Sequence, residues 1–157
     1  MWTTVRNARG AMTRAAAAST VLAVVLAMAP ASDAAPNSLS VPIAGLRSDA
    51  GQVGCLLFAS ADGFPANADK AVGRQFVPIA SKSSTCVFDN VAPGSYAIAA
   101  IHDENGNGKL DKNFLGIPTE GYGASRDARG TMGPPKWSDA VFAYGGGATQ
   151  VPVVIHY

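Results

Sequence analysis

The chain is short of the residues that several functional classes require. It has two cysteines and two histidines, His102 and His156, among 157 residues. A zinc site needs several such ligands at suitable spacing, so zinc is not expected, and His102 is expected to be a structural histidine. No G-x-S-x-G motif is present, so the nucleophile elbow of a serine hydrolase is missing. We therefore expect no enzymatic activity.

Charge of one sign is also lacking. Only 15% of the residues are charged and the formal net charge is +1. Residues 35–157 hold nine Lys and Arg and ten Asp and Glu, a formal charge of −1. Nucleic-acid binding needs a basic face that displaces counterions from phosphates, so no nucleic-acid partner is expected. Attraction to an anionic membrane surface is disfavoured for the same reason.

The N-terminus has the pattern of a secretory signal peptide. Arg6, Arg9 and Arg14 precede an apolar run over 15–29, and small residues follow Pro30. This run is shorter than the ~20 residues that span a bilayer. We expect a signal peptide over 1–34 and a single domain over 35–157, exported to the periplasm or secreted, with no stable membrane insertion after cleavage.

Both cysteines, Cys55 and Cys86, lie in the exported part, in segments that are expected to be strands. An even number of cysteines in an exported chain favours a disulfide. The alternative is two buried thiols that behave as small hydrophobic side chains.

Short apolar, β-branched segments recur along the chain and are separated by Gly, Pro, Asp and Ser. They predict strands over 39–46, 52–59, 74–80, 85–89, 96–101 and 149–157. Residues 103–137 lack any periodic pattern and are expected to form one long irregular loop. The predicted fold is an all-β, antiparallel sandwich of six to seven strands.

The most specific motif is the D-x-N-x-N-G-x-x-D run of residues 103–111. Its side-chain oxygens alternate before a glycine, which is how a short loop surrounds calcium. Calcium is therefore the candidate cofactor. The proposed ligands are Asp103, Asn105, Asn107, the carbonyl of Lys109, and Asp111. Phe114 stands where an EF-hand has its closing Glu, and Glu120 is the candidate that folds back to replace it.

Two alternatives to this calcium loop stay open. Asn and Asp can bond their own backbone two residues on, so the run also suits a metal-free, hydrogen-bonded turn. A carboxylate pair such as Asp103 and Glu120, with His102 nearby, would instead suit a small hydrolase, for example on glycans.

Two aromatic residues, Tyr122 and Trp137, flank the irregular segment and are candidate ligand-binding residues. Their alternative role is ordinary packing of the loop. The leading hypothesis is a non-enzymatic, exported binding or structural module. Its ligand is unknown, with a carbohydrate or an envelope protein as candidates. An envelope adaptor that pairs an edge strand with a partner chain is a further alternative.

Several motifs together resemble a known family. The turn and strand of residues 88–98 resemble prealbumin-like and carboxypeptidase-regulatory-like sandwiches. Residues 102–111, 116–123 and 133–140 resemble an uncharacterised family of exported bacterial proteins, domain of unknown function 2141, over about residues 39–157. The resemblance implies a prealbumin-like sandwich and no established activity. After Ser125 that family typically has asparagines, whereas this chain has Arg126 and Asp127.

Overall fold

The computed structural model describes residues 37–157, and this part of the chain forms one compact unit. The predicted signal peptide, 1–34, lies outside the described residues. Among residues 37–157, no helix is both long and apolar enough to cross a membrane.

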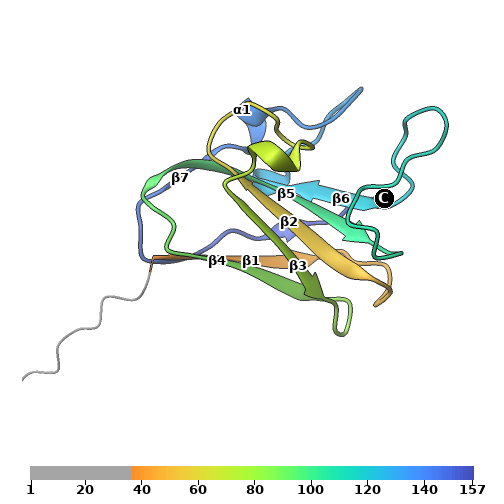
Figure 1. Ribbon diagram of the computed structural model, residues 1–157, viewed down its shortest axis with the longest axis horizontal. Coiled ribbons are helices and arrows are strands. Elements are labelled where there is room, and N and C mark those ends of the chain that lie inside the picture. Colours follow the sequence, from red (N-terminus) through yellow and green to blue (C-terminus); the bar gives the residue numbers. More distant parts are fainter. Residues whose placement is uncertain (1–36) are drawn as a thin grey trace, which may run out of the picture. The chain divides into compact units, whose positions relative to one another are not determined.

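Two β-sheets face each other across the core (Figure 1). The four-stranded sheet contains β1 (Ser38–Ala44), β4 (Ser84–Asp89), β8 (Ala148–Gln150) and β9 (Val153–Val154). The five-stranded sheet contains β2 (Gln52–Phe58), β3 (Gly73–Pro78), β5 (Gly94–Asp103), β6 (Gly121–Ala124) and β7 (Phe142–Tyr144). The all-β sandwich predicted from the sequence is confirmed.

Alternation of side chains explains why these segments form strands. In β1 every second residue, Leu39, Val41 and Ile43, is buried. The opposing sheet contributes Leu57 and Ile98 to the same core cluster. Successive side chains of a strand point to opposite faces, so a period of two places one apolar face against the other sheet.

The end of the chain differs from the prediction of one antiparallel strand over 149–157. Pro152 separates β8 from β9, and both strands pair with β1 in parallel. Proline has no backbone N–H to donate to the ladder, so the strand is interrupted there. Over residues 37–157 the sandwich is therefore mixed in strand direction, with nine strands rather than six or seven.

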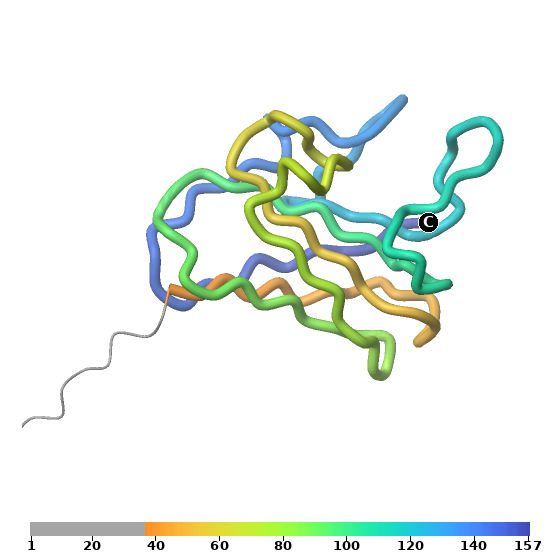
Figure 2. Tube along the Cα trace, in the orientation of Figure 1, coloured from red at the N-terminus to blue at the C-terminus, as the bar shows by residue number. Residues whose placement is uncertain are grey.

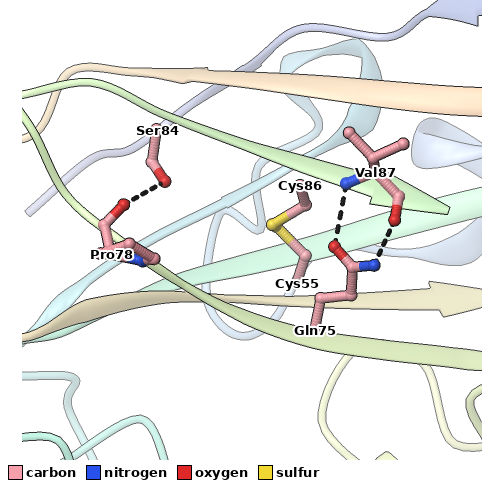
Figure 3. Close-up of a disulfide and its surroundings, with 6 residues drawn as sticks. All are labelled: Cys55, Gln75, Pro78, Ser84, Cys86 and Val87. Atoms are coloured by element: carbon pink, nitrogen blue, oxygen red, sulfur yellow. Dashed lines mark hydrogen bonds between the residues drawn. A yellow bond between two sulfur atoms is a disulfide. The ribbon is translucent and has the colours of Figure 1, made fainter.

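One side of the sandwich is closed covalently and by hydrogen bonds (Figure 3). The predicted disulfide between Cys55 and Cys86 is present and joins β2 to β4. The side-chain amide of Gln75 on β3 accepts from Val87 N–H at 2.9 Å and also donates to the Val87 carbonyl. Gln75 thus replaces a neighbouring strand at this edge of β4.

The other side is closed by the C-terminal segment. Tyr122 of β6 and His156 exchange two backbone hydrogen bonds, each of 2.9 Å. An unpaired edge strand could accept a strand from a partner chain. At Val87 of β4 and at Tyr122 of β6, the edge is instead hydrogen-bonded to groups of the same chain.

The predicted irregular segment 103–137 is less uniform than expected. It contains β6 and the short 3₁₀ turn η2 (Ser125–Asp127), and α1 (Trp137–Ala140) follows it. Another 3₁₀ turn, η1 (Ala68–Lys70), lies between β2 and β3. Two irregular loops remain, residues 104–120 and 128–136, and both extend from the side of the five-stranded sheet (Figure 2).

Residues 126 and 127, where the family resemblance led us to expect asparagine, have an unusual backbone conformation. Arg126 and Asp127 both have positive φ, at 61° and 52°, a conformation that asparagine tolerates better than most residues. Here long-range contacts hold that geometry instead. Arg126 donates to the carbonyl of Val141 at 3.0 Å, and Asp127 lies 2.7 Å from the ring nitrogen of His156.

Candidate functional site

Asp103, the last residue of β5, organises the acidic loop from a buried position. Its Oδ1 accepts from the N–H of Asn107 at 2.9 Å. Its Oδ2 accepts from the N–H of Gly108 at 2.8 Å and from the side chain of Gln52 at 2.7 Å. Gly108 has a φ of 78°, which a glycine adopts without strain. The loop therefore folds back around its first carboxylate.

These contacts determine the ionisation of Asp103. Burial raises the pKa of this carboxyl group, but the hydrogen bonds from Gln52, Gly108 and Asn107 outweigh burial, and the net pKa lies below its ordinary value. The carboxylate is thus held in its charged form by donors within the protein.

Two loop amides converge on Asp111. The Nδ2 atoms of Asn105 and Asn107 donate to the Asp111 carboxylate at 2.6 and 2.9 Å. The amide oxygen of Asn105 accepts from the N–H of Asn107 at 3.0 Å, and that of Asn107 accepts from the N–H of Lys109 at 2.9 Å. These are the backbone-bonded turns of the metal-free alternative.

Glu120 folds back onto the loop, as the sequence predicted, but its oxygens meet N–H groups. Oε1 accepts from Glu104 N–H at 2.8 Å, and Oε2 accepts from Asp111 N–H at 3.0 Å. Glu120 is 5% exposed. Its carboxylate joins the two ends of the turn that begins at Glu104 and ends at Asp111.

The predicted calcium ligands are close in the structure without forming a cage of oxygens. Across residues 37–157, no three His, Cys, Asp or Glu side chains come together as a group that could hold a metal. The oxygens of Asp103, Asn105 and Asn107 face N–H donors. Binding of calcium would require the two amides to turn their oxygens toward Asp111, and it stays a prediction.

His102 lies on the opposite face of β5 and is fully buried. Its Nε2 donates to the carbonyl of Ala50 at 2.8 Å, so its Nδ1 accepts from the Tyr157 hydroxyl at 2.5 Å. The Arg47 guanidinium covers the Tyr157 ring at 4.4 Å and forms two hydrogen bonds with Glu104, at 2.8 and 2.5 Å. His102 therefore connects the C-terminal residue to the base of the loop, in the structural role expected for it.

The Arg47 contact also determines the ionisation of Glu104. Its hydrogen bond and charge lower the pKa of Glu104 below the ordinary value, despite an opposing effect of burial. Burial raises the pKa of Tyr157, so its hydroxyl stays protonated and can donate to His102.

A large groove covers the outer face of the five-stranded sheet. Its volume is about 850 Å³. Side chains that point away from the core form its floor, among them Leu56, Phe76, Ile101 and Tyr122. Gly54 leaves room for the Phe76 ring on this face, because a Cβ at Gly54 would lie 2.7 Å from that ring. The groove is thus built on the open part of this apolar sheet face, whose other end is covered where Phe64 and Trp137 pack against Ala97.

The two irregular loops form the walls of this groove. Leu115 and Ile117 come from the loop that follows the acidic turn, and Met132 comes from the loop before α1. Leu115 is 67% exposed and Met132 is fully exposed. The acidic turn therefore supports one wall of an open apolar groove.

The charged residues that line the groove are all basic. They are Arg74, Lys109 and Lys112. Among the described residues, these three side chains have no ion-pair partner, as is also true of Lys82, Arg126 and Lys136, whereas Arg47, Lys70 and Arg129 are each paired with a carboxylate. The groove thus combines an apolar floor with unpaired positive charge.

The two candidate aromatic residues occupy different surroundings. Tyr122 is in the floor of the groove. Trp137 does not line it and packs edge-on against Phe64, with ring centroids 5.9 Å apart. Phe64 in turn contacts Phe58. Trp137 therefore has the packing role that was its alternative interpretation.

Sequence reasoning missed the groove floor, although β5 contained a signal for it. Residues 96–101 are continuously apolar instead of alternating, which is typical of a strand covered on both faces. Here Ile98 and Ala100 face the core, while Ala99 and Ile101 face the groove.

In a comparison with family models, a match covers residues 41–152. The matching model is DUF2141, described as an uncharacterized protein conserved in bacteria. The chain belongs to this family. No curated protein and no solved structure gave a significant match.

The DUF2141 match includes the acidic turn and every residue that lines the groove. The segment of Ile155, His156 and Tyr157, which completes the edge beside β6, follows the matched range. The groove and its wall therefore belong to the part of the chain shared with the family.

Proposed function

We propose that this protein is an exported, non-enzymatic binding module whose ligand occupies the groove over the five-stranded sheet. The observation that carries the proposal is the apolar, open cavity of about 850 Å³. Ligand sites are typically concave, mostly apolar and about 300–1,000 Å³ in volume, with a few polar groups. In this proposal the acidic loop positions a wall of the groove.

Export belongs to the same proposal. It is supported by the signal-peptide pattern of residues 1–34 and by the disulfide between Cys55 and Cys86, since disulfides persist in oxidising compartments. Fractionation of the native cells, followed by N-terminal sequencing of the mature protein, tests it. A protein that stays in the cytoplasm with an intact N-terminus would contradict export.

The environment of the acidic residues supports a binding role over the hydrolase alternative. Asp103, Glu120 and His102 are all buried and engaged in hydrogen bonds, and none of them lines the groove. A general acid or base must reach the proton that it transfers. These three side chains hold backbone and neighbouring side chains instead.

Two of the sheet edges, those of β4 and β6, give the envelope-adaptor alternative little support, whereas β8 and β3 form the opposite edges of the two sheets. Gln75 occupies the edge of β4 at Val87, and His156 occupies the edge of β6 at Tyr122. Addition of a partner strand needs free N–H and carbonyl groups along an exposed edge.

Titration with Nile red, a neutral apolar dye, tests the groove. The oxidised protein should increase the dye fluorescence saturably, with one site per chain. Leu115→Asp and Met132→Asp, both at exposed wall positions, should weaken binding by about tenfold, because each introduces a charge beside the apolar dye.

Val72→Asp is the matched control. Val72 is 61% exposed and lines another cavity of about 380 Å³ near β3 and β4, which shares Arg74 with the groove but none of its apolar lining residues. Its substitution should leave dye binding unchanged. Absence of saturable binding, or an equal loss in all three variants, would contradict the proposed site.

A further inference from the structure

The charge pattern of the groove indicates what kind of ligand it takes. Its floor is apolar, and its charged lining residues, Arg74, Lys109 and Lys112, are all basic. We call these three side chains the cationic rim. A ligand that matches both features has an apolar chain and a negatively charged head.

The cationic rim stands out because the domain as a whole is slightly acidic, with a formal charge of −1 over residues 35–157. All three side chains are exposed and lack an ion-pair partner among the described residues. Unpaired cations beside an apolar surface favour an anion, since long-range attraction and a charge-assisted hydrogen bond both contribute.

The geometry points to a single long-chain carboxylate as the ligand, with its chain along the sheet face and its carboxylate at the cationic rim. This inference rests on the proposed function and adds the ligand class. The volume of about 850 Å³ suits one extended chain in a groove of ordinary ligand-site size.

A second copy of this chain fits the groove less well. In a twofold dimer the same patch occurs on both partners, so both cationic rims would be buried in one interface. Like charges brought together at an interface oppose association.

A bilayer surface would use a different part of the protein. Phe114 is 95% exposed at the end of the loop and does not line the groove. Insertion into a membrane would bury Phe114, whereas a single chain in the groove leaves it exposed. Phe114→Asp therefore distinguishes binding to a bilayer surface from binding of a single free chain in the groove.

The test uses cis-parinaric acid, a long-chain carboxylate that fluoresces in apolar surroundings. The oxidised protein should bind it saturably, at one per chain. Dodecanoate should displace it at a concentration about tenfold lower than dodecanol or dodecyltrimethylammonium, with the two ionic competitors below their critical micelle concentrations and dodecanol below its solubility limit. The three competitors share one chain, so the comparison isolates the charge of the head.

The triple variant Arg74→Gln, Lys109→Gln, Lys112→Gln removes the cationic rim at exposed positions. It should abolish the tenfold preference for dodecanoate and still bind Nile red as the unsubstituted protein does. Lys82→Gln, at an exposed position outside the groove, is the control and should keep the preference. Phe114→Asp should also bind cis-parinaric acid normally.

Several results would overturn the inference. Equal displacement by the three competitors, with Nile red binding retained, would remove the carboxylate assignment and leave the proposed function standing. If the unsubstituted protein bound neither cis-parinaric acid nor Nile red, both the carboxylate assignment and the proposed function would be refuted. Binding to anionic vesicles that Phe114→Asp abolishes, without binding of the free acid, would assign the surface to a membrane. A dimer in sedimentation that Leu115→Asp dissociates would assign it to a second copy.

Discussion

The Oε2 atom of Glu120 accepts a hydrogen bond from the backbone N–H of Asp111 at 3.0 Å. Its other carboxylate oxygen accepts from the N–H of Glu104 at 2.8 Å. The sequence predicted this approach of Glu120 as the closing ligand of a calcium site. In the structure the same fold-back satisfies two backbone donors, and it thereby holds the loop that supports one groove wall.

Glu120→Gln should therefore destabilise the protein. The amide retains one acceptor oxygen but turns an NH₂ group toward an N–H donor, which costs about 1–3 kcal/mol of the free energy of unfolding. Urea denaturation measures the loss, and hydrogen exchange should speed up at the amides of Glu104 and Asp111. Asp139→Asn, at an exposed carboxylate, is the control. Unchanged exchange at both amides would show that Glu120 does not hold the loop.

Calcium should raise the melting temperature if the predicted ligands of the loop bind it, since a ligand of the folded state alone stabilises that state. EDTA should reverse the increase. Asp111→Asn should abolish the calcium effect, because Asp111 is the carboxylate on which Asn105 and Asn107 converge. An unchanged melting temperature, or an equal effect in the variant, would refute calcium binding by this loop.

Loss of the disulfide should destabilise the sandwich strongly. Cys55 and Cys86 are 31 residues apart in the sequence, and closure of a loop of that length contributes about 3–4 kcal/mol in the chain-entropy model. The double variant Cys55→Ala, Cys86→Ala should lose that amount in urea denaturation. Dithiothreitol should lower the melting temperature of the unsubstituted protein and leave that of the double variant unchanged. A reductant effect of equal size on both proteins would contradict this assignment.

Gln75→Ala should release one edge of the sandwich. It removes both side-chain hydrogen bonds to Val87 and leaves a backbone N–H and a carbonyl without their protein partner. We expect a loss of about 1–3 kcal/mol in the free energy of unfolding. We also expect self-association by edge pairing, detected by sedimentation. Thr85→Ala, at an exposed position of β4, should show neither effect. A monomeric variant of normal stability would exclude this role of Gln75.

Stability should fall at acid pH because of the loop carboxylates. The folded-state pKa of Asp103 lies below its ordinary value, near 4 in an unfolded chain. Its contribution is therefore fully present above about pH 4, and it is lost as the pH falls through the lower folded-state pKa. Glu104 acts in the same direction through Arg47.

The variant that tests this contribution is Asp103→Asn. It should flatten the dependence of unfolding free energy on pH below about 4, measured by urea denaturation at several pH values. Asp69→Asn, at an exposed carboxylate, should leave the dependence as it is. If Asp103→Asn does not fold, Arg47→Gln should give a smaller flattening through Glu104. Unchanged acid dependence in both variants would contradict the assignment.

Local patterns were sufficient for the strands that alternate cleanly. A strand over 39–46 was predicted from its apolar, β-branched residues, and in the structure Leu39, Val41 and Ile43, which stand at every second position of β1, are all buried. The pairing of Cys55 with Cys86 was also predictable, because the chain has two cysteines and both lie on strands. The fold-back of Glu120 followed from the turn that Gly116 allows.

Other features depend on contacts that are distant in the sequence. Gln75 reads as an ordinary strand residue, and its amide closes an edge only because Val87 lies opposite. The parallel pairing of β8 and β9 with β1 joins segments more than 100 residues apart. Trp137 reads as a candidate binding residue until Phe64 is seen to pack against it.

The sequence by itself was sufficient to predict an all-β domain, it favoured a disulfide, and it offered a tight turn over residues 103–111 as one of two interpretations. Such features depend on alternation, residue type and backbone freedom, which act between neighbours in the chain. Only the tertiary structure decided that Asp103 and Glu120 accept hydrogen bonds from the backbone, and that the turn supports a wall beside an apolar groove. The physical reason is that the groove has its floor on strands 52–58, 73–78, 94–103 and 121–124, which meet only in the folded sheet.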